Sequence, residues 1–425
     1  MHTAVLITFI IGYAVITLEN SFKINKAAIA LVTGVLCWVF YIFSVPDIHS
    51  ASHTLLTQVG DIAGILFFLL GAMTIVELID AHNGFDIITR KVTTSNKRKL
   101  LWIISILTFL LSALLDNLTT TIVMITLIRK LISDKDTRLF FAGMIIISAN
   151  AGGAFSPIGD VTTTMLWIGG QITPLQIIGK LFLPSLACLL IPLLVLNFYV
   201  KGTIIRPEDK TVYTSKNKKE QQLIFFAGLV CLIFVPVFKS ITHLPPFMGM
   251  LMALGIMWII TELIHKSKND EDKDSLSVAY ALQKIDTPSI LFFLGILMAI
   301  GALQASGQLS QLSAWLTSNI KTDTQLTSSI GLLSAVIDNV PLVAASQNMF
   351  SMQQYPTDHF FWELLAYCTG TGGSILIIGS AAGVAAMGME KIGFFWYLKR
   401  FSLLALLGYF AGILTYLLQH YLLHL

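Results

Sequence analysis

Apolar runs long enough to cross a lipid bilayer recur along the chain and constrain its fold more than any other feature. A spanning helix needs about 20 mostly apolar residues. Only 12% of the 425 residues are charged and 55% are hydrophobic, whereas an ordinary soluble domain is about 25% charged. The sequence therefore predicts an all-α polytopic membrane protein. The predicted spans are 4–18, 27–44, 60–80, 139–168, 177–200, 221–238, 247–264, 287–303, 361–389 and 401–422.

The dipeptide Asp-Asn occurs twice, each time in the middle of an apolar stretch. The two occurrences are Asp116-Asn117 within 100–132 and Asp338-Asn339 within 326–350. A carboxylate inside the hydrocarbon of a bilayer is costly and rarely lacks a function. The two pairs therefore indicate one ion-handling site. The alternative is that each aspartate only caps the helix that follows it.

The residues that follow each Asp-Asn pair are too few to recross the membrane. The return legs, about 118–128 and 340–350, contain roughly 11 residues each and would cover about 17 Å of a hydrocarbon core about 30 Å thick. We therefore predict that both stretches are re-entrant hairpins with the Asp-Asn pairs at their tips. Such tips must be shielded by protein or line a wet cavity.

The basic residues support this topology. If both stretches are hairpins, all of the 27 Lys and Arg residues except Lys180, Lys239 and Lys321 fall in loops on one side of the membrane. Cytoplasmic loops carry an excess of Lys and Arg. The chain is therefore predicted to be a multi-pass protein of the inner (plasma) membrane with both termini extracytoplasmic.

The two halves of the chain carry the same short motifs in the same order. An Ile-Leu-Phe-Phe-Leu run, a Ser-Ala…Asp-Asn motif and a Gly-Gly…Gly motif each occur once per half at a nearly constant offset. With five spans and one hairpin in each half, the second half must enter the membrane upside down. We therefore predict two inverted repeats, 1–200 and 221–425, joined by a cytoplasmic linker at 201–220.

Glycines and a proline interrupt the span 139–168. Such residues favour an unwound segment that exposes backbone groups, so we expect a discontinuous helix in each half. Oxygen-bearing side chains, which suit hard cations such as Na⁺ or Li⁺, cluster around the interruption, and its counterpart in 361–389 is also polar. The first set is Asn150, Ser156, Asp160, Thr162 and Thr163, and the second is Thr371, Ser374 and Ser380.

These polar residues also have structural interpretations. Asp160 could be only a helix cap, and Ser and Thr in membrane helices often bond back to the backbone. Ser380 stands where Asp160 stands in the first half. The decisive charge is therefore predicted to lie in the first half.

The other acidic residues are expected at membrane edges. Glu77 is a candidate for a proton pathway or a charge at the membrane rim, and Glu363 and Glu390 are expected to be solvated. The mixed-charge runs 208–220 and 262–273 are expected to be solvated loops. Histidine is not expected to carry protons, because no histidine lies deep in a predicted span except His420.

Three motifs together resemble the NhaD-type sodium/proton antiporters of the ion transporter superfamily: DNLTTT at 116–121, NAGGAFSPIGDVTTT at 150–164 and DNVP at 338–341. The resemblance covers essentially the full length. It implies inverted repeats, hairpin tips that meet broken helices, and exchange of cytoplasmic Na⁺ or Li⁺ for external protons. It also implies a homodimer.

We therefore predict a secondary antiporter rather than an enzyme, without a cofactor, in which Asp116, Asp160 and Asp338 surround a midplane cavity and bind Na⁺, Li⁺ or H⁺ by turns. The leading alternative is an anion, dicarboxylate or arsenite transporter of the same superfamily, which the paired acids disfavour. An ion channel would share such a site without coupled exchange. An intramembrane aspartyl protease is disfavoured because Pro157 replaces the first glycine of its GxGD motif.

Overall fold

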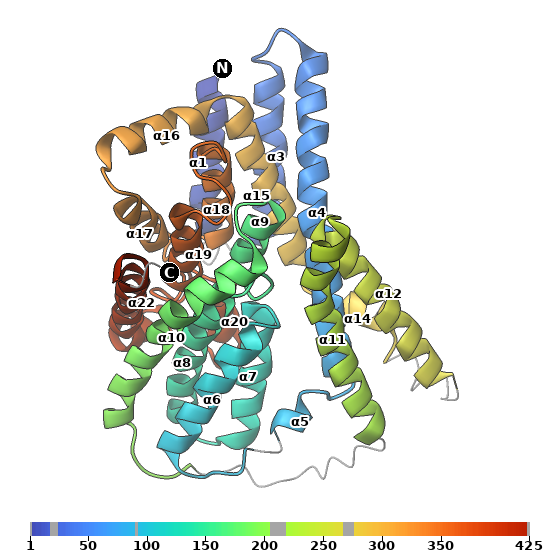
Figure 1. Cartoon of the computed structure of the whole chain (residues 1–425), viewed down its shortest axis with the longest axis vertical. Helices are drawn as coiled ribbons and strands as arrows, with labels where there is room; N and C mark the ends of the chain where they lie inside the picture. The colour runs from blue at the N-terminus through green and yellow to red at the C-terminus, as the bar shows by residue number, and fades with distance from the viewer. Residues whose placement is uncertain (1, 18–23, 90–91, 205–217, 267–275, 423–425) are drawn as a thin grey trace.

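The computed structural model describes residues 2–17, 24–89, 92–204, 218–266 and 276–422. These residues are helical (Figure 1), apart from connections and one isolated bridge between Asn96 and Thr203. In chain order the helices are α1 (His2–Thr17), α3 (Lys26–Ile42), α4 (Ile48–Ala81), α5 (Asp86–Thr89), α6 (Lys97–Ser112), α7 (Asn117–Leu131), α8 (Lys135–Ala154), α9 (Val161–Ile168), α10 (Pro174–Tyr199), α11 (Lys218–Thr242), α12 (Pro246–His265), α14 (Val278–Lys284), α15 (Thr287–Ala305), α16 (Gln308–Asn319), α17 (Asp323–Leu333), α18 (Asn339–Met349), α19 (Phe360–Gly372), α20 (Ala381–Glu390), α21 (Phe394–Tyr397), the π-helical turn η1 (Leu398–Ser402) and α22 (Leu403–Leu422).

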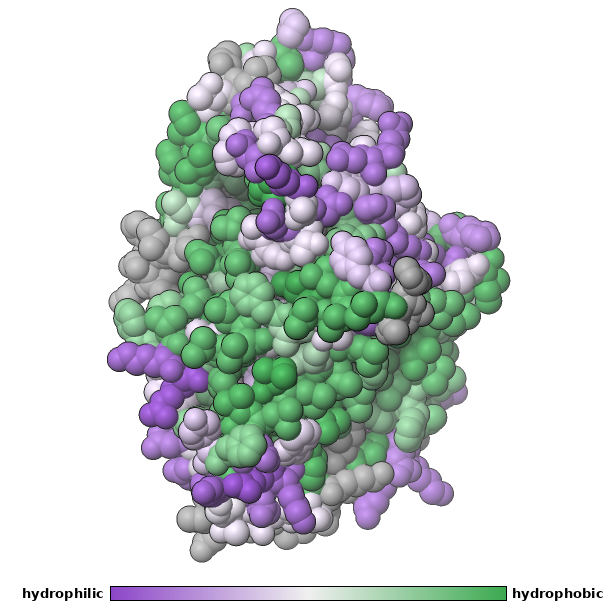
Figure 2. All heavy atoms as spheres, turned by 60° about the vertical axis from the view of Figure 1, so that its left-hand side comes forward, coloured by the Kyte–Doolittle hydropathy of each residue, from purple (hydrophilic) through white to green (hydrophobic). Residues whose placement is uncertain are grey.

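Six helices in the described residues are long and apolar enough to cross a membrane. They are α4, α10, α11, α12, α15 and the continuous helix Phe394–Leu422. Large apolar side chains such as Leu175, Phe198 and Leu403 are more than 60% exposed. Figure 2 shows that such residues form a band across the middle of one face, with hydrophilic residues gathered at both ends. The prediction of an all-α, multi-span membrane protein is confirmed.

Helix α4 is much longer than the predicted span 60–80. Its 34 residues begin at Ile48, directly after Asp47, whose side chain accepts a hydrogen bond of 3.0 Å from the backbone N–H of His49. The first three turns are rich in Ser, Thr and His, so no apolar run reveals them. At about 1.5 Å per residue the helix is roughly 50 Å long, and in Figure 1 it reaches the upper end of the molecule beside α3.

Helix α16 was not predicted at all. It follows Gly307, whose φ of 76° lies in the left-handed region that glycine adopts readily. Only Leu309 of its residues is buried, so it has no apolar run that would reveal it. Figure 1 shows α16 lying across the upper end of the molecule.

Short non-helical segments, called the four interruptions below, separate α6 from α7 (113–116), α8 from α9 (155–160), α17 from α18 (334–338) and α19 from α20 (373–380). Both Asp-Asn pairs and both Gly-rich motifs lie at these interruptions. The first return leg was predicted too short, because α7 has 15 residues and continues to Leu131. Its length of about 22 Å is still less than a bilayer core of about 30 Å.

Glu390 is buried rather than solvated, contrary to the prediction. Its carboxylate accepts hydrogen bonds from the guanidinium groups of Arg129 at 2.6 Å and Arg138 at 3.2 Å, and its side chain is 2% exposed. These contacts join the end of α20 to α7 and α8. Glu363 is also buried and accepts a hydrogen bond of 2.5 Å from the hydroxyl of Tyr416. The sequence could not identify these three partners, because each is distant along the chain from the glutamate that it contacts.

Replacing Glu390 with Gln should lower the free energy of unfolding by about 1–3 kcal/mol, because two guanidinium groups lose a buried charged acceptor. Asp86→Asn is the matched control. It weakens a more exposed ion pair with Lys130, at 3.4 Å, and should cost less than about 1 kcal/mol. Thermal unfolding of the two purified variants measures the difference, and equal losses would contradict the structural role of Glu390.

Glu220 and His265 come from the two runs that were expected to be solvated loops, and both are buried. The reason is that α11 begins at Lys218 and α12 continues to His265, so each run contributes one turn of helix to the protein interior. Residues 208–217 and 267–273 of these runs lie outside the described residues.

The helices pack in two groups. The first contains α1, α3, α4, α11, α12, α14 and α15, and the second contains α6–α10, α17, α19, α20 and α22. Helix α18 contacts members of both groups, including α15 and α9, and α4 also contacts α9. All four interruptions belong to helices of the second group or to α18.

Candidate ion site

Asp160 lies at the centre of a buried polar cluster. It is 1% exposed and caps α9, where one carboxylate oxygen accepts hydrogen bonds from the backbone N–H of Thr162 at 2.9 Å and from its hydroxyl at 2.7 Å. The other oxygen accepts a hydrogen bond of 2.6 Å from the side-chain amide of Asn117. Asp160 is therefore a helix cap, as the structural alternative expected, and also contacts the first Asp-Asn pair.

The second Asp-Asn pair reaches the same carboxylate. The side-chain amide nitrogen of Asn339 lies 3.4 and 3.5 Å from the two oxygens of Asp160. Both asparagines are buried and begin the helices α7 and α18. One acidic side chain is thus contacted by an amide from each half of the chain.

Asn150, from α8, extends this cluster into the second half of the sequence. Its oxygen accepts a hydrogen bond of 3.0 Å from Asn117, and its nitrogen donates to the hydroxyls of Ser374 at 2.8 Å and Ser380 at 2.9 Å. All four interrupted regions therefore contribute to one connected set of side chains. We call this set the Asp160 network; its members are Asn117, Asn150, Asp160, Thr162, Asn339, Ser374 and Ser380.

The aspartates of the two Asp-Asn pairs hydrogen-bond locally. Asp116 accepts hydrogen bonds from the backbone N–H of Thr119 at 2.8 Å and its hydroxyl at 2.5 Å. Asp338 accepts one of 3.2 Å from the backbone N–H of Val340. Both therefore act as helix caps, and both also line one cavity with Asn117. Their role in ion binding stays a prediction.

Three further predicted residues have other hydrogen-bonding environments. The hydroxyl of Ser156 donates to the carbonyl of Ala113 at 2.5 Å, and that of Thr371 donates to the carbonyl of Tyr367 at 2.7 Å. The buried hydroxyl of Thr163 has no hydrogen-bond partner among the described residues. Glu77 is half-buried on α4, in the other packing group.

Glycines allow the interrupted segments to lie directly against each other. A Cβ atom at Gly159 would collide with the backbone carbonyl of Ser112, and one at Gly379 would lie 2.6 Å from the carbonyl of Ala335. No real Cβ approaches a carbonyl so closely, so any other residue would push the two segments apart. The Gly-rich motifs therefore set the distance between Asp160 and the Asp-Asn turns.

Sequence reasoning missed Lys26, whose ammonium nitrogen lies 3.7 Å from a carboxylate oxygen of Asp338. The sequence predicts only that Lys26 is a basic residue of a cytoplasmic loop. Lys26 begins α3, where a positive charge opposes the helix dipole, and this unfavourable position was the only available signal. Its side chain and Asp286 line a cavity of about 610 Å³, which shares Lys26 and Ser289 with the cavity beside Asp116.

Comparison with known proteins finds relatives over nearly the whole chain. The model of the CitMHS family, described as citrate transporter, matches residues 13–372. Sodium/proton antiporter 1 of Arabidopsis thaliana is 48% identical over 98% of this chain and 72% of its own length, and sodium/proton antiporter 2 of the same plant is 44% identical over 97% and 98%. The Na(+)/H(+) antiporter NhaD of Vibrio cholerae is 31% identical over 98% and 92%. The chain therefore belongs to the CitMHS family and, within it, to the NhaD-type sodium/proton antiporters.

Proposed function

We propose that this protein is a secondary transporter that exchanges cytoplasmic Na⁺ or Li⁺ for external protons at the Asp160 network. The relatives named as sodium/proton antiporters support this activity. The observation that carries the site assignment is the contact of one buried carboxylate, Asp160, with amides from both Asp-Asn pairs.

Competition for one carboxylate can couple the two ions. A buried carboxylate without a proton needs a compensating cation, and with a proton it needs none. In the present arrangement the nitrogen of Asn117 faces Asp160. A bound Na⁺ requires oxygen ligands, so we infer that the Asn117 amide rotates to present its oxygen when the cation enters. Proton and cation then exclude each other.

Access from one face at a time would complete the exchange. The cavity of about 610 Å³ that Lys26 and Asp286 line lies at ends of α3 and α15 predicted to be cytoplasmic, and it adjoins the cavity beside Asp116 and Asp338. A second cavity, of about 760 Å³, lies at the far end of α9 and is lined by Asp61 and Gln347. We propose that cations enter by the first route and protons by the second.

Alternating access between these routes requires two bodies that move. We propose that the group containing the interrupted helices moves against the group containing α4 and α15. The inverted-repeat architecture, 1–200 and 221–425 with re-entrant hairpins, is part of this proposal. It is supported by the matching of Gly159 with Gly379, each of which packs against the turn of its own half. Residues 205–217 of the proposed linker lie outside the described residues.

The homodimer, the plasma membrane location and the extracytoplasmic termini are also proposals for this chain. Chemical cross-linking in membranes would test the dimer. Labelling of cysteines introduced at the two ends of the chain, with a reagent that cannot cross the membrane, would test the orientation.

A citrate or dicarboxylate carrier is the second candidate, and the description of the CitMHS family favours it. Three carboxylates line or form the proposed site, however, and they repel an anionic substrate. Protein reconstituted into liposomes should dissipate a pH gradient when Na⁺ or Li⁺ is added and should not accumulate labelled citrate. Citrate uptake without cation-dependent proton movement would replace the proposal with this alternative.

Replacing Lys26 with Gln should lower the KM for Na⁺ about 3- to 10-fold, because removing a positive charge from the proposed cation route is worth about 1 kcal/mol in a partly screened environment. Lys321→Gln, exposed between α16 and α17, is the control and should leave KM unchanged. The measurement is the Na⁺ dependence of proton exchange in liposomes. A higher KM for Lys26→Gln would contradict the proposed route.

A further inference from the structure

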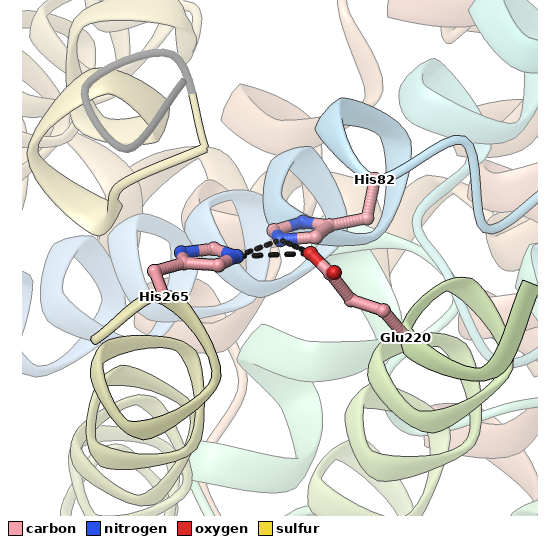
Figure 3. Close-up of side chains that lie close together, drawn as sticks. All are labelled: His82, Glu220 and His265. Atoms are coloured by element: carbon pink, nitrogen blue, oxygen red, sulfur yellow. Dashed lines mark hydrogen bonds and ion pairs between the residues drawn. The ribbon is translucent and has the colours of Figure 1, made fainter. Parts of the chain in front are cut away.

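Two histidines and a glutamate meet far from the Asp160 network. His82 follows the end of α4, Glu220 lies in the first turn of α11 and His265 is the last residue of α12. Figure 3 shows their side chains converging from these three helices. They are 6%, 8% and 2% exposed, and no ligand-spacing motif in the sequence connects them.

The three facing atoms form a compact triangle. The two Nε2 atoms of His82 and His265 are 3.1 Å apart, Nε2 of His265 is 3.1 Å from Oε1 of Glu220, and Nε2 of His82 is 3.8 Å from the same oxygen. The imidazole planes differ by only 7° and their centroids are 5.1 Å apart. The rings therefore meet at their nitrogen corners rather than face to face, as Figure 3 shows.

The proton position on His82 makes this triangle electron-rich. Nδ1 of His82 lies 2.7 Å from the carbonyl oxygen of Leu78. A carbonyl only accepts hydrogen bonds, so Nδ1 carries a proton and, in the neutral ring, Nε2 presents its lone pair to the triangle. The carboxylate oxygen of Glu220 also presents lone pairs there. Two hydrogen-bond acceptors, Nε2 of His82 and Oε1 of Glu220, therefore face the third atom of the triangle, Nε2 of His265.

We propose that His82, Glu220 and His265 form a binding site for a divalent transition-metal ion of the Zn²⁺ type. A circle through three atoms separated by 3.1, 3.1 and 3.8 Å has a radius of about 2.0 Å, close to the Zn–N and Zn–O bond lengths of about 2.0–2.2 Å. One ion near the centre of the triangle would thus reach all three ligands without a large movement. This site would be distinct from the Asp160 network, the proposed site of the transported cations.

The ligand set selects the class of metal. Imidazole nitrogens suit Zn²⁺, Cu²⁺ and Ni²⁺, whereas Mg²⁺, Ca²⁺ and Na⁺ prefer oxygen. The hydrogen bond from Nδ1 of His82 to a backbone carbonyl is the usual second-shell contact of a metal-binding histidine, and it fixes the ring orientation. Two histidines and one carboxylate also leave a fourth coordination position for water.

A bound metal ion would cross-link three helices of one packing group. The ligands come from the ends of α4, α11 and α12, which already pack together. Binding to the folded state alone raises its stability by mass action. A bound metal should therefore raise the unfolding temperature without a cation entering the Asp160 network.

The test uses the full-length, untagged protein in detergent, stripped of metal with a chelator. Zn²⁺ is then titrated in competition with a chromogenic zinc chelator, and the loaded protein is studied by X-ray absorption at the zinc edge. We expect one tightly bound Zn²⁺ per chain, with nitrogen and oxygen ligands at about 2.0–2.1 Å and no sulfur. Thermal unfolding should shift upward on zinc addition.

Variants assign the ligands. His265→Gln and Glu220→Gln should each weaken zinc binding by more than about 100-fold, since removing a ligand costs more than the 10- to 100-fold effect of a second-shell partner. His49→Gln, exposed at the start of α4, is the matched histidine control and should bind zinc as the wild type does. If either ligand variant fails to fold, the wild-type absorption spectrum decides, because a spectrum without imidazole ligands overturns the proposal. Wild-type protein that binds no zinc at micromolar concentration overturns it as well.

Discussion

Asp160→Asn should abolish Na⁺-driven proton exchange, with a loss of more than about 100-fold, because the cation loses a buried counter-charge worth several kcal/mol. The amide can neither bind a proton reversibly near neutral pH nor balance Na⁺. It also brings an NH₂ donor into a position surrounded by donors from Asn117 and Thr162. The measurement is the rate of pH-gradient dissipation in liposomes after addition of NaCl or LiCl.

Asp136→Asn is the matched control for this experiment. Asp136 is exposed in the first turn of α8, so its loss changes the same side-chain chemistry without touching the Asp160 network. It should exchange at the wild-type rate. Wild-type exchange by Asp160→Asn, with intact folding, would remove Asp160 from the transport mechanism and leave Asp116 and Asp338 as the remaining candidates.

Gly159→Ala should reduce both stability and transport. The added methyl group would collide with the carbonyl of Ser112, and overpacking against backbone costs about 1–3 kcal/mol. The structure can relieve the collision only by separating the turn that carries Asn117 from the segment that carries Asp160. We therefore expect a lower unfolding temperature and at least a 10-fold loss of exchange, since about 1.4 kcal/mol corresponds to a factor of 10.

The control is Gly255→Ala. Gly255 lies in α12 with nothing within 4 Å of the position that a Cβ would occupy, and alanine in a helix interior is favoured over glycine by about 1 kcal/mol. This variant should transport normally and be equally or more stable. Normal exchange by Gly159→Ala would mean that the close contact with Ser112 is not needed to hold the ion site.

The fold class could be predicted from the sequence because a bilayer tolerates few solutions. Long apolar runs must become helices, and α10, α11, α12 and α15 lie within a few residues of their predicted positions. The polar part of α4 and all of α16 were not predicted, because these segments lack apolar runs. The burial of Glu220 and Glu390 was not predicted either. Charged residues are expected at the surface unless a partner is known, and the partners come from distant helices.

The candidate site was only partly predictable. Asp160, Asn150, Asn117 and Asn339 were all identified from their position inside apolar stretches, and the structure brings them together. The sequence could not tell which member of each Asp-Asn pair points toward Asp160. That choice depends on the rotation of the turn, and the aspartates instead cap the helices that follow them. The ion pair between Lys26 and Asp338 depends on a contact between distant helices that no local pattern records.

If the Asp160 network is the ion site, as we propose, the hydrogen bonds from Asn150 to Ser374 and Ser380 restrict how the transported ion can change sides. The Asp160 network contains side chains from both halves of the chain. The two halves therefore cannot separate there without breaking buried hydrogen bonds. The ion-occupied network would therefore have to move as one rigid body relative to the rest of the protein. Mutations that remove these hydrogen bonds should therefore allow uncoupled ion movement across the membrane, rather than only lower the rate of exchange.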